Sequence, residues 1–160
     1  MSSEPIKIGL LGLGNVGQGV VNVLRTNADE ISRRVGRPLQ VTHASARDLN
    51  RKRAVSTDGI ELVADPMHIA RDADVDIVIE AIGGMEPARA LLLAALERGK
   101  PVVTANKALV AVHGNEIFAA GAKSGVPVSF EAAVAGGIPI IKALREGLSG
   151  NRISGLAGII

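Results

Sequence analysis

A glycine-rich turn near the start of the chain constrains the fold more than any other feature. The short apolar run Ile6–Leu11 leads directly into it, and apolar or small side chains recur at helical spacing after it, from Asn15 to Val35. The turn has the spacing Gly-x-Gly-x-x-Gly and consists of Gly12, Leu13, Gly14, Asn15, Val16 and Gly17. A buried strand, a glycine turn and an amphipathic helix in this order are typical of the first unit of a parallel α/β sheet.

Each glycine of the turn has a separate physical use. Gly12 permits a tight turn, Gly14 lets the backbone approach a pyrophosphate closely, and Gly17 lets the helix pack against the strand. The unpaired amides and the positive dipole end of the helix then attract the pyrophosphate charge. We therefore predict a dinucleotide-binding site at this turn. A glycine turn without a ligand is the alternative.

The rest of the chain alternates between expected strands and expected helices. We expect further strands at residues 39–46, 60–64, 75–82, 101–105 and 126–131. We expect helices after the Asp65-Pro66 cap and at about residues 86–98, 113–123 and 138–148. Only two of the 160 residues are aromatic, both of them Phe, so Val, Ile, Leu and Ala must form the core. The fold class that follows is α/β, with a doubly wound, mainly parallel sheet of the Rossmann-like kind.

Ligands of such sheets bind beyond the carboxyl ends of the strands, and the end of the second strand decides which dinucleotide is preferred. A carboxylate there binds the ribose hydroxyls, whereas a cation binds a 2′-phosphate. Arg47 follows the second expected strand, and Asp48 stands one position too far along to fill the carboxylate role comfortably. The sequence therefore favours NADP, with NAD still possible. The basic loop from Arg47 to Arg53 fits either a solvated surface or a phosphate-binding one.

Three further segments carry a family resemblance. They are residues 76–84, Asp-Ile-Val-Ile-Glu-Ala-Ile-Gly-Gly, residues 103–109, Val-Thr-Ala-Asn-Lys-Ala-Leu, and residues 131–139, Glu-Ala-Ala-Val-Ala-Gly-Gly-Ile-Pro. Their order and spacing resemble homoserine dehydrogenase, over nearly the whole chain. The resemblance implies reversible hydride transfer between a nicotinamide cofactor and C4 of L-homoserine or L-aspartate 4-semialdehyde, a step toward threonine and methionine.

The same resemblance assigns roles to residues at the expected strand ends. Lys107 would hydrogen-bond the reacting oxygen and offset the charge that develops on it, while an ordinary surface lysine is the alternative. The residues expected to contact the cofactor, besides the glycine turn and Arg47, are Ile82, Gly83, Thr104, Asn106 and Lys107.

The resemblance also implies a division of the chain into domains. Residues 1–134 are expected to form the dinucleotide-binding domain, and residues 135–160 the truncated beginning of a substrate and dimerisation domain. The groups that grip the substrate and transfer its proton would lie beyond Ile160. This chain is therefore expected to bind cofactor but to be inactive alone, and the complete protein is expected to be a homodimer.

The segment from Glu131 to Ile138 is similar to the family's site for a monovalent cation, which would be sodium. The ligands implied are Glu131 and the main-chain carbonyls of Val134, Gly136 and Ile138, and hard cations prefer such oxygens. Without the resemblance, Glu131 is better interpreted as a hydrogen-bonding group and the glycines as parts of a strand-to-helix turn.

Other polar residues are expected to have structural roles. Glu80 ends the fourth expected strand, where backbone amides near the cofactor would satisfy it, because an unpaired buried carboxylate is costly. His43, His68 and His113 have neither metal-ligand spacing nor a nucleophile arrangement around them, so we expect packing or surface positions for all three.

The composition excludes several classes of function. A net charge of +2 and the lack of aromatic residues in the basic loop argue against nucleic-acid binding. The absence of cysteine excludes a thiol nucleophile and fits a cytoplasmic location, and no apolar run approaches the roughly 18 residues of a membrane span. Two alternatives remain: another Rossmann-type aldehyde or imine reductase, and a nicotinamide-sensing regulator, for which a DNA-binding module would be expected.

Overall fold

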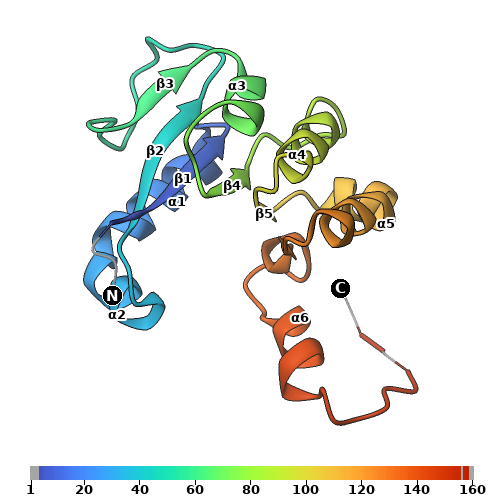
Figure 1. Ribbon diagram of the computed structural model, residues 1–160. Coiled ribbons are helices and arrows are strands. Elements are labelled where there is room, and N and C mark those ends of the chain that lie inside the picture. Colours follow the sequence, from blue (N-terminus) through green and yellow to red (C-terminus); the bar gives the residue numbers. More distant parts are fainter. Residues whose placement is uncertain (1–3, 156, 159–160) are drawn as a thin grey trace.

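The computed structural model describes residues 4–155 and 157–158. Its centre is a six-stranded sheet in the order β3-β2-β1-β4-β5-β6, in which every neighbouring pair is parallel (Figure 1). The strands are β1 (Ile6–Leu11), β2 (Leu39–Ser45), β3 (Glu61–Val63), β4 (Ile77–Glu80), β5 (Val102–Thr104) and β6 (Val128–Ser129). The predicted doubly wound parallel sheet is therefore confirmed.

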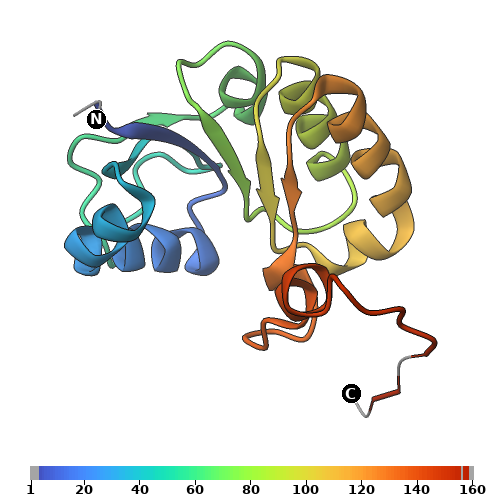
Figure 2. The ribbon, with the colours of Figure 1, turned by 60° about the horizontal axis from the view of Figure 1, so that its bottom comes forward.

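Helices cover both faces of this sheet. They are α1 (Asn15–Thr26), α2 (Ala28–Val35), α3 (Pro66–Arg71), α4 (Ala88–Glu97) and α5 (Lys107–Ser124). Successive side chains of a strand point to opposite faces, so Leu10 belongs to the core cluster under α1 and Leu11 to the cluster under α3, α4 and α5. Figure 2 shows α4 and α5 side by side, apart from α1 and α2. Within the described residues, no helix has the length and apolar composition needed to cross a membrane.

The single helix predicted from residue 15 to residue 35 is wrong, because the chain divides into α1 and α2 at Asn27. The backbone amide and the side-chain Nδ2 of Asn27 both donate to the carbonyl of Val23, at 3.0 and 3.2 Å. An asparagine side chain that bonds locally in this way competes with continuation of the helix.

Two helix starts depend on side-chain caps. The Asp65 cap predicted for α3 is confirmed, since Asp65 Oδ1 accepts the amide of Met67 at 2.9 Å. The start of α5 was predicted too late, at about residue 113. Asn106 Oδ1 accepts the amide of Leu109 at 3.1 Å, and this cap begins the helix at Lys107.

The chain after β6 is only partly regular. The 3-10 helix η1 (Glu131–Ala133) is followed by α6 (Ile140–Lys142), which continues into the π-helical turn η2 (Ala143–Gly147). These two elements replace the α-helix predicted over residues 138–148. The apolar stretch that begins at Ile153 is described at residues 153–155 and 157–158, and these residues are irregular and form no strand.

Candidate functional site

The glycine turn joins β1 to α1 with three different steric environments. Gly12 has a φ of 96°, and a Cβ there would lie 3.0 Å from the carbonyl oxygen of Ala81. A Cβ on Gly17 would lie 2.1 Å from the carbonyl oxygen of Gly12, whereas one on Gly14 would meet nothing within 4 Å. The turn is thus tight at its first glycine, closely packed at its third and open at its second. That open side allows a ligand to approach the backbone.

The first turn of α1 is suited to an anion. Gly14 is its N-cap residue and provides no side-chain cap, and no acidic residue lies in the first turn. The first amides of a helix have no partner within the helix, and they stand at the positive end of its dipole. A phosphate group placed there would receive hydrogen bonds that the protein itself leaves unmade.

Ser45, at the end of β2, holds the glycine turn in place. Its Oγ accepts the amide of Gly12 at 3.0 Å, and its carbonyl oxygen accepts the amide of Leu13 at 2.9 Å. Ser45 is only 3% exposed. This role of Ser45 was not predicted, and the one signal for it in the sequence is a small polar side chain at the last position of an expected strand.

A cleft of about 470 Å³ opens beside this turn, at the carboxyl ends of β1, β2 and β4. It brings together several predicted cofactor residues, namely Gly12, Leu13, Gly14, Arg47 and Ile82. It also contains residues that were not among the predicted cofactor contacts, namely Ser45, Ala46, Asp48, Arg51, Arg53, Ala64, Pro66, Ala81 and Pro87. The other predicted cofactor residues lie outside this lining. They are Asn15, Val16 and Gly17 at the start of α1, and Gly83, Thr104, Asn106 and Lys107 around the neighbouring strand ends.

The basic loop after β2 is folded around Arg53. The guanidinium of Arg53 donates to the carbonyls of Leu49, Arg51 and Asp48, at 3.1, 2.9 and 2.7 Å. The carboxylate of Asp48 accepts the amide of Asn50 at 2.9 Å. In the part of the chain that the structure describes, Arg47 is exposed and has no polar partner of its own.

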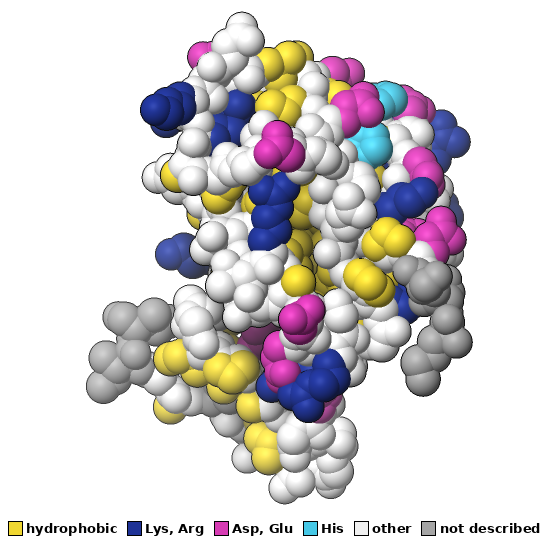
Figure 3. All heavy atoms as spheres, turned by 90° about the vertical axis from the view of Figure 1, so that its left-hand side faces the viewer, with side chains coloured by type: hydrophobic (Ala, Val, Ile, Leu, Met, Phe, Trp, Pro, Cys, Tyr) yellow, Lys and Arg dark blue, Asp and Glu magenta, His cyan; other side chains and the backbone are white. Residues whose placement is uncertain are grey.

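One face of the molecule carries charges of both signs. On the face that Figure 3 shows, Lys and Arg side chains lie between Asp and Glu side chains and do not form one continuous basic area. That face shows no continuous basic stripe of the kind that marks a nucleic-acid-binding protein.

The ends of β4 and β5 are joined through a buried carboxylate. Glu80 is completely buried, and its Oε1 accepts the amides of Ile82 and Gly83 at 2.9 and 2.8 Å. Its Oε2 accepts the hydroxyl of Thr104 at 2.6 Å. The prediction that backbone amides satisfy Glu80 is therefore confirmed. The side chain of Thr104 is itself completely buried, and that of Lys107 is exposed at the first position of α5.

Glu131 connects the end of the sheet to α6. Its two carboxylate oxygens accept the amides of Ile141 and Lys142 at 3.0 and 2.9 Å. Ala135 and Gly136 have φ values of 54° and 61°, so the segment between Glu131 and α6 turns sharply. Among the described residues, no group of three His, Cys, Asp or Glu side chains could hold a metal ion, so any cation site here would depend on carbonyl oxygens.

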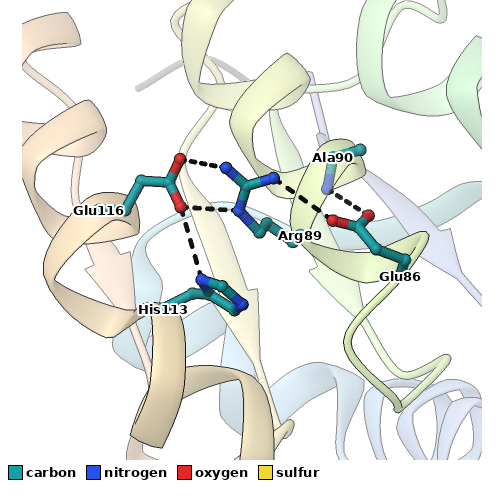
Figure 4. A network of polar contacts seen from close by, with 5 residues as sticks. All are labelled: Glu86, Arg89, Ala90, His113 and Glu116. Atoms are coloured by element: carbon teal, nitrogen blue, oxygen red, sulfur yellow. Dashed lines mark hydrogen bonds and ion pairs between the residues drawn. The ribbon is translucent and has the colours of Figure 1, made fainter.

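An ion-pair network ties α4 to α5 (Figure 4). Arg89 donates through Nε to Glu116 at 2.7 Å, makes a second bond to the same carboxylate, and pairs with Glu86 at 3.4 Å. Hydrogen bonding to Glu116, and then to Glu86, raises the pKa of Arg89, and the bond from Arg89 lowers the pKa of Glu116. His113 lies 3.7 Å from Glu116.

The three histidines occupy the packing or surface positions that were expected. His43 faces Glu61 at 3.5 Å, and His68 faces Asp72 at 3.9 Å. His113 lies beside Glu116, so each of the three histidines has an acidic neighbour, and none of them lines the cleft.

Comparison with known proteins identifies the family. The family model described as homoserine dehydrogenase, NAD binding domain, matches residues 12–131. A homoserine dehydrogenase of Pseudomonas aeruginosa is 56% identical over 98% of this chain and 36% of its own length. The crystal structure of a homoserine dehydrogenase from Thiobacillus denitrificans is 58% identical, with a TM-score of 0.87, over 93% of this chain and 34% of that one.

A more distant structure contains a cofactor. It is a hyperthermophilic archaeal homoserine dehydrogenase in complex with NADPH, 25% identical with a TM-score of 0.74, over 92% of this chain and 50% of that one. The chain spans about a third of the length of its more similar relatives. With its parallel sheet, glycine turn and cleft, this chain belongs to the homoserine dehydrogenase family and carries that family's NAD-binding domain.

Proposed function

We propose that this chain is the cofactor-binding part of an enzyme that interconverts L-homoserine and L-aspartate 4-semialdehyde by hydride transfer. The observation that carries the proposal is the cleft in which the first three residues of the glycine turn meet Arg47 and Ile82, in a chain of this family. The nicotinamide ring supplies the chemistry when the cofactor is bound, since it accepts a hydride from one substrate form and returns it to the other.

The amides at the start of α1 would bind the cofactor's pyrophosphate, with Gly14 leaving room for its approach. Arg47 would bind a 2′-phosphate, because it lines the cleft and keeps an unpartnered guanidinium in the described structure. Asp48 is less suited to bind ribose hydroxyls, because its carboxylate already accepts an amide of its own loop. These contacts favour NADP over NAD, as does the likeness to the archaeal enzyme with NADPH.

Lys107 is the proposed catalytic residue. The carboxyl end of β5 and the Asn106 cap place it at the sheet edge that also holds the glycine turn, with its side chain exposed. A lysine in the first turn of a helix gains nothing from the helix dipole, so helix stability does not account for it. Its ammonium group would donate to the substrate's C4 oxygen and stabilise the negative charge that develops there.

Residues after β6 would begin the second domain. The last strand of the sheet ends at Ser129 and the family match ends at Glu131, which supports a boundary near residue 134.

A monovalent cation, most simply sodium, would be held by Glu131 and the carbonyls of Val134, Gly136 and Ile138. These donors are all oxygens, and in the part of the chain that the structure describes each carboxylate oxygen of Glu131 accepts one amide, which leaves lone pairs for a cation. The complete protein is proposed to be a homodimer.

The direct test is an activity assay of the complete protein with L-homoserine and NADP⁺. We expect NADPH to accumulate only when homoserine is present, and the Lys107→Ala variant to lose turnover while its melting temperature stays near that of wild type. A complete, folded protein that binds NADPH but reduces no NADP⁺ with homoserine would contradict the proposed reaction.

A further inference from the structure

A closed ring of hydrogen bonds links the turn after β4 to the turn after β5. Glu80 Oε1 accepts the amide of Gly83 at 2.8 Å, and the next residue, Gly84, accepts Asn106 Nδ2 through its carbonyl at 2.5 Å. The amide of Asn106 donates to Thr104 Oγ1 at 3.0 Å, and this hydroxyl donates to Glu80 Oε2 at 2.6 Å. We call this set, Glu80, Gly83, Gly84, Thr104 and Asn106, the Glu80 ring.

The side chains of the Glu80 ring are shielded from water. Glu80 and Thr104 are 0% exposed and Asn106 is 7% exposed. Hydrogen bonds in such surroundings hold their geometry firmly, because each broken bond leaves a buried polar group without a partner. The amides of Ile82 and Gly83 and the hydroxyl of Thr104 all donate to the one carboxylate, so this group holds donors from both turns.

The ring is attached to both parts of the proposed site. On one side, the amide of Ile82 is bound to Glu80, and Ile82 lines the cofactor cleft. On the other side, Asn106 caps α5, and Lys107 is the next residue along the chain. The ring therefore connects the cleft wall at Ile82 to the backbone at Lys107.

We propose that Glu80 and Thr104 are positioning residues, which set Lys107 relative to the nicotinamide end of the cofactor cleft. This inference rests on the proposed function, in which Lys107 acts on the substrate oxygen. Thr104 thus acts through its buried hydroxyl and through Lys107 rather than by a contact of its side chain with the cofactor. The hydride step is sensitive to such positioning, since a misplacement of about 1 Å can lower a rate on the order of 10²-fold.

The test compares Thr104→Val, which removes the hydroxyl at nearly constant shape, with Thr104→Ser, which keeps it. Thr42→Val is the matched control, because Thr42 lies within β2 and its hydroxyl contacts His43 instead of the ring. In the complete protein, we expect Thr104→Val to lower kcat on the order of 10²-fold with little change in the dissociation constant of NADPH. Thr104→Ser should restore most of this loss, and Thr42→Val should cause none.

Two further readouts separate positioning from a general loss of structure. With homoserine deuterated at C4, the isotope effect on kcat should rise in Thr104→Val, because a misplaced site slows hydride transfer itself, whereas a smaller fraction of folded enzyme leaves the effect unchanged. In a Lys107→Ala background, Thr104→Val should cause little further loss. An equal loss in both backgrounds, or an NADPH affinity that falls as far as kcat, overturns the proposal.

The ring can also be tested independently of the reaction, in the chain as given, by amide hydrogen exchange. Thr104→Val should speed exchange at Ile82 and Gly83, which lie on the other turn, while Thr42→Val should not. Unchanged exchange at both amides overturns the coupling of the two turns. If wild type shows no turnover of homoserine, the proposed function fails, and the exchange result still decides whether the ring couples the turns.

Discussion

Single residues set the shape of the glycine turn, and its three glycines do so in different ways. Gly12 needs its positive φ, and Gly17 needs the space that a side chain would take from the carbonyl of Gly12. Gly14 needs neither a positive φ nor extra space for the fold, since a Cβ there meets nothing within 4 Å. These uses could be predicted from the spacing of the glycines. The role of Ser45 could not, because a serine at a strand end has many possible partners and only the folded sheet selects the amide of Gly12.

Gly17 gives a sharp prediction at this scale. In Gly17→Ala, the new methyl group must displace the carbonyl of Gly12, so we expect a loss of stability of about 1 to 3 kcal/mol, as in overpacked cores. We also expect the distorted turn of Gly17→Ala to bind NADPH about tenfold less tightly, which corresponds to about 1.4 kcal/mol of binding free energy.

Gly19→Ala is the matched control for Gly17→Ala. Gly19 lies in the same helix with open space around its Cβ position, so alanine there should stabilise the protein by up to about 1 kcal/mol and leave NADPH affinity unchanged. Urea unfolding and NADPH titration measure both effects. Equal behaviour of the two variants would show that the close packing at Gly17 is unimportant.

Secondary-structure elements were predictable where their ends depend on local chemistry. Asp65 and Pro66 marked the start of α3 correctly, because a cap and a proline act on their own helix. The break at Asn27 could not be read from the apolar spacing, which continues through both α1 and α2. The early start of α5 was missed for a related reason, since Asn106 became recognisable as a cap only once its bonds to Gly84 and Leu109 were known.

The contact between α4 and α5 predicts a pH dependence. The bond from Arg89 lowers the pKa of Glu116, so the stabilisation by this pair is present above the ordinary glutamate pKa of about 4.3 and is lost as the pH falls through the lower value of the folded protein. Arg89→Met should therefore lower the melting temperature at about pH 7, and its difference from wild type should narrow as the pH falls toward about 3.

Glu116→Gln provides the control for this pH dependence. Glu116→Gln removes the titrating group, so its difference in melting temperature from wild type should also narrow as the pH falls. In the Glu116→Gln background, Arg89→Met should lower the melting temperature little further. A melting-temperature difference that stays constant between about pH 7 and about pH 3 would argue against the ion pair as its source.

At the scale of the whole molecule, the strand order explains where the site lies. The chain proceeds outward from β1 to β3 and then returns to β4 beside β1, so the strand ends at this reversal leave a cleft between them. The alternation of strands and helices was enough to predict this edge. The alternation did not predict the structure of the residues after β6, where exposed apolar side chains such as Ile138 and Leu148 give no periodic pattern of burial.

Calorimetric titration of this chain with NADPH and with NADH tests most directly whether it forms a dinucleotide site that prefers NADPH. We expect tighter binding of NADPH, and a loss of about 10- to 100-fold in Arg47→Ala, since a hydrogen bond to a charged group contributes about 1.5 to 3 kcal/mol. NADH affinity should not change, and Lys52→Ala, which removes one charge from the same loop outside the cleft lining, should retain NADPH binding. A folded chain that binds neither dinucleotide would contradict the account.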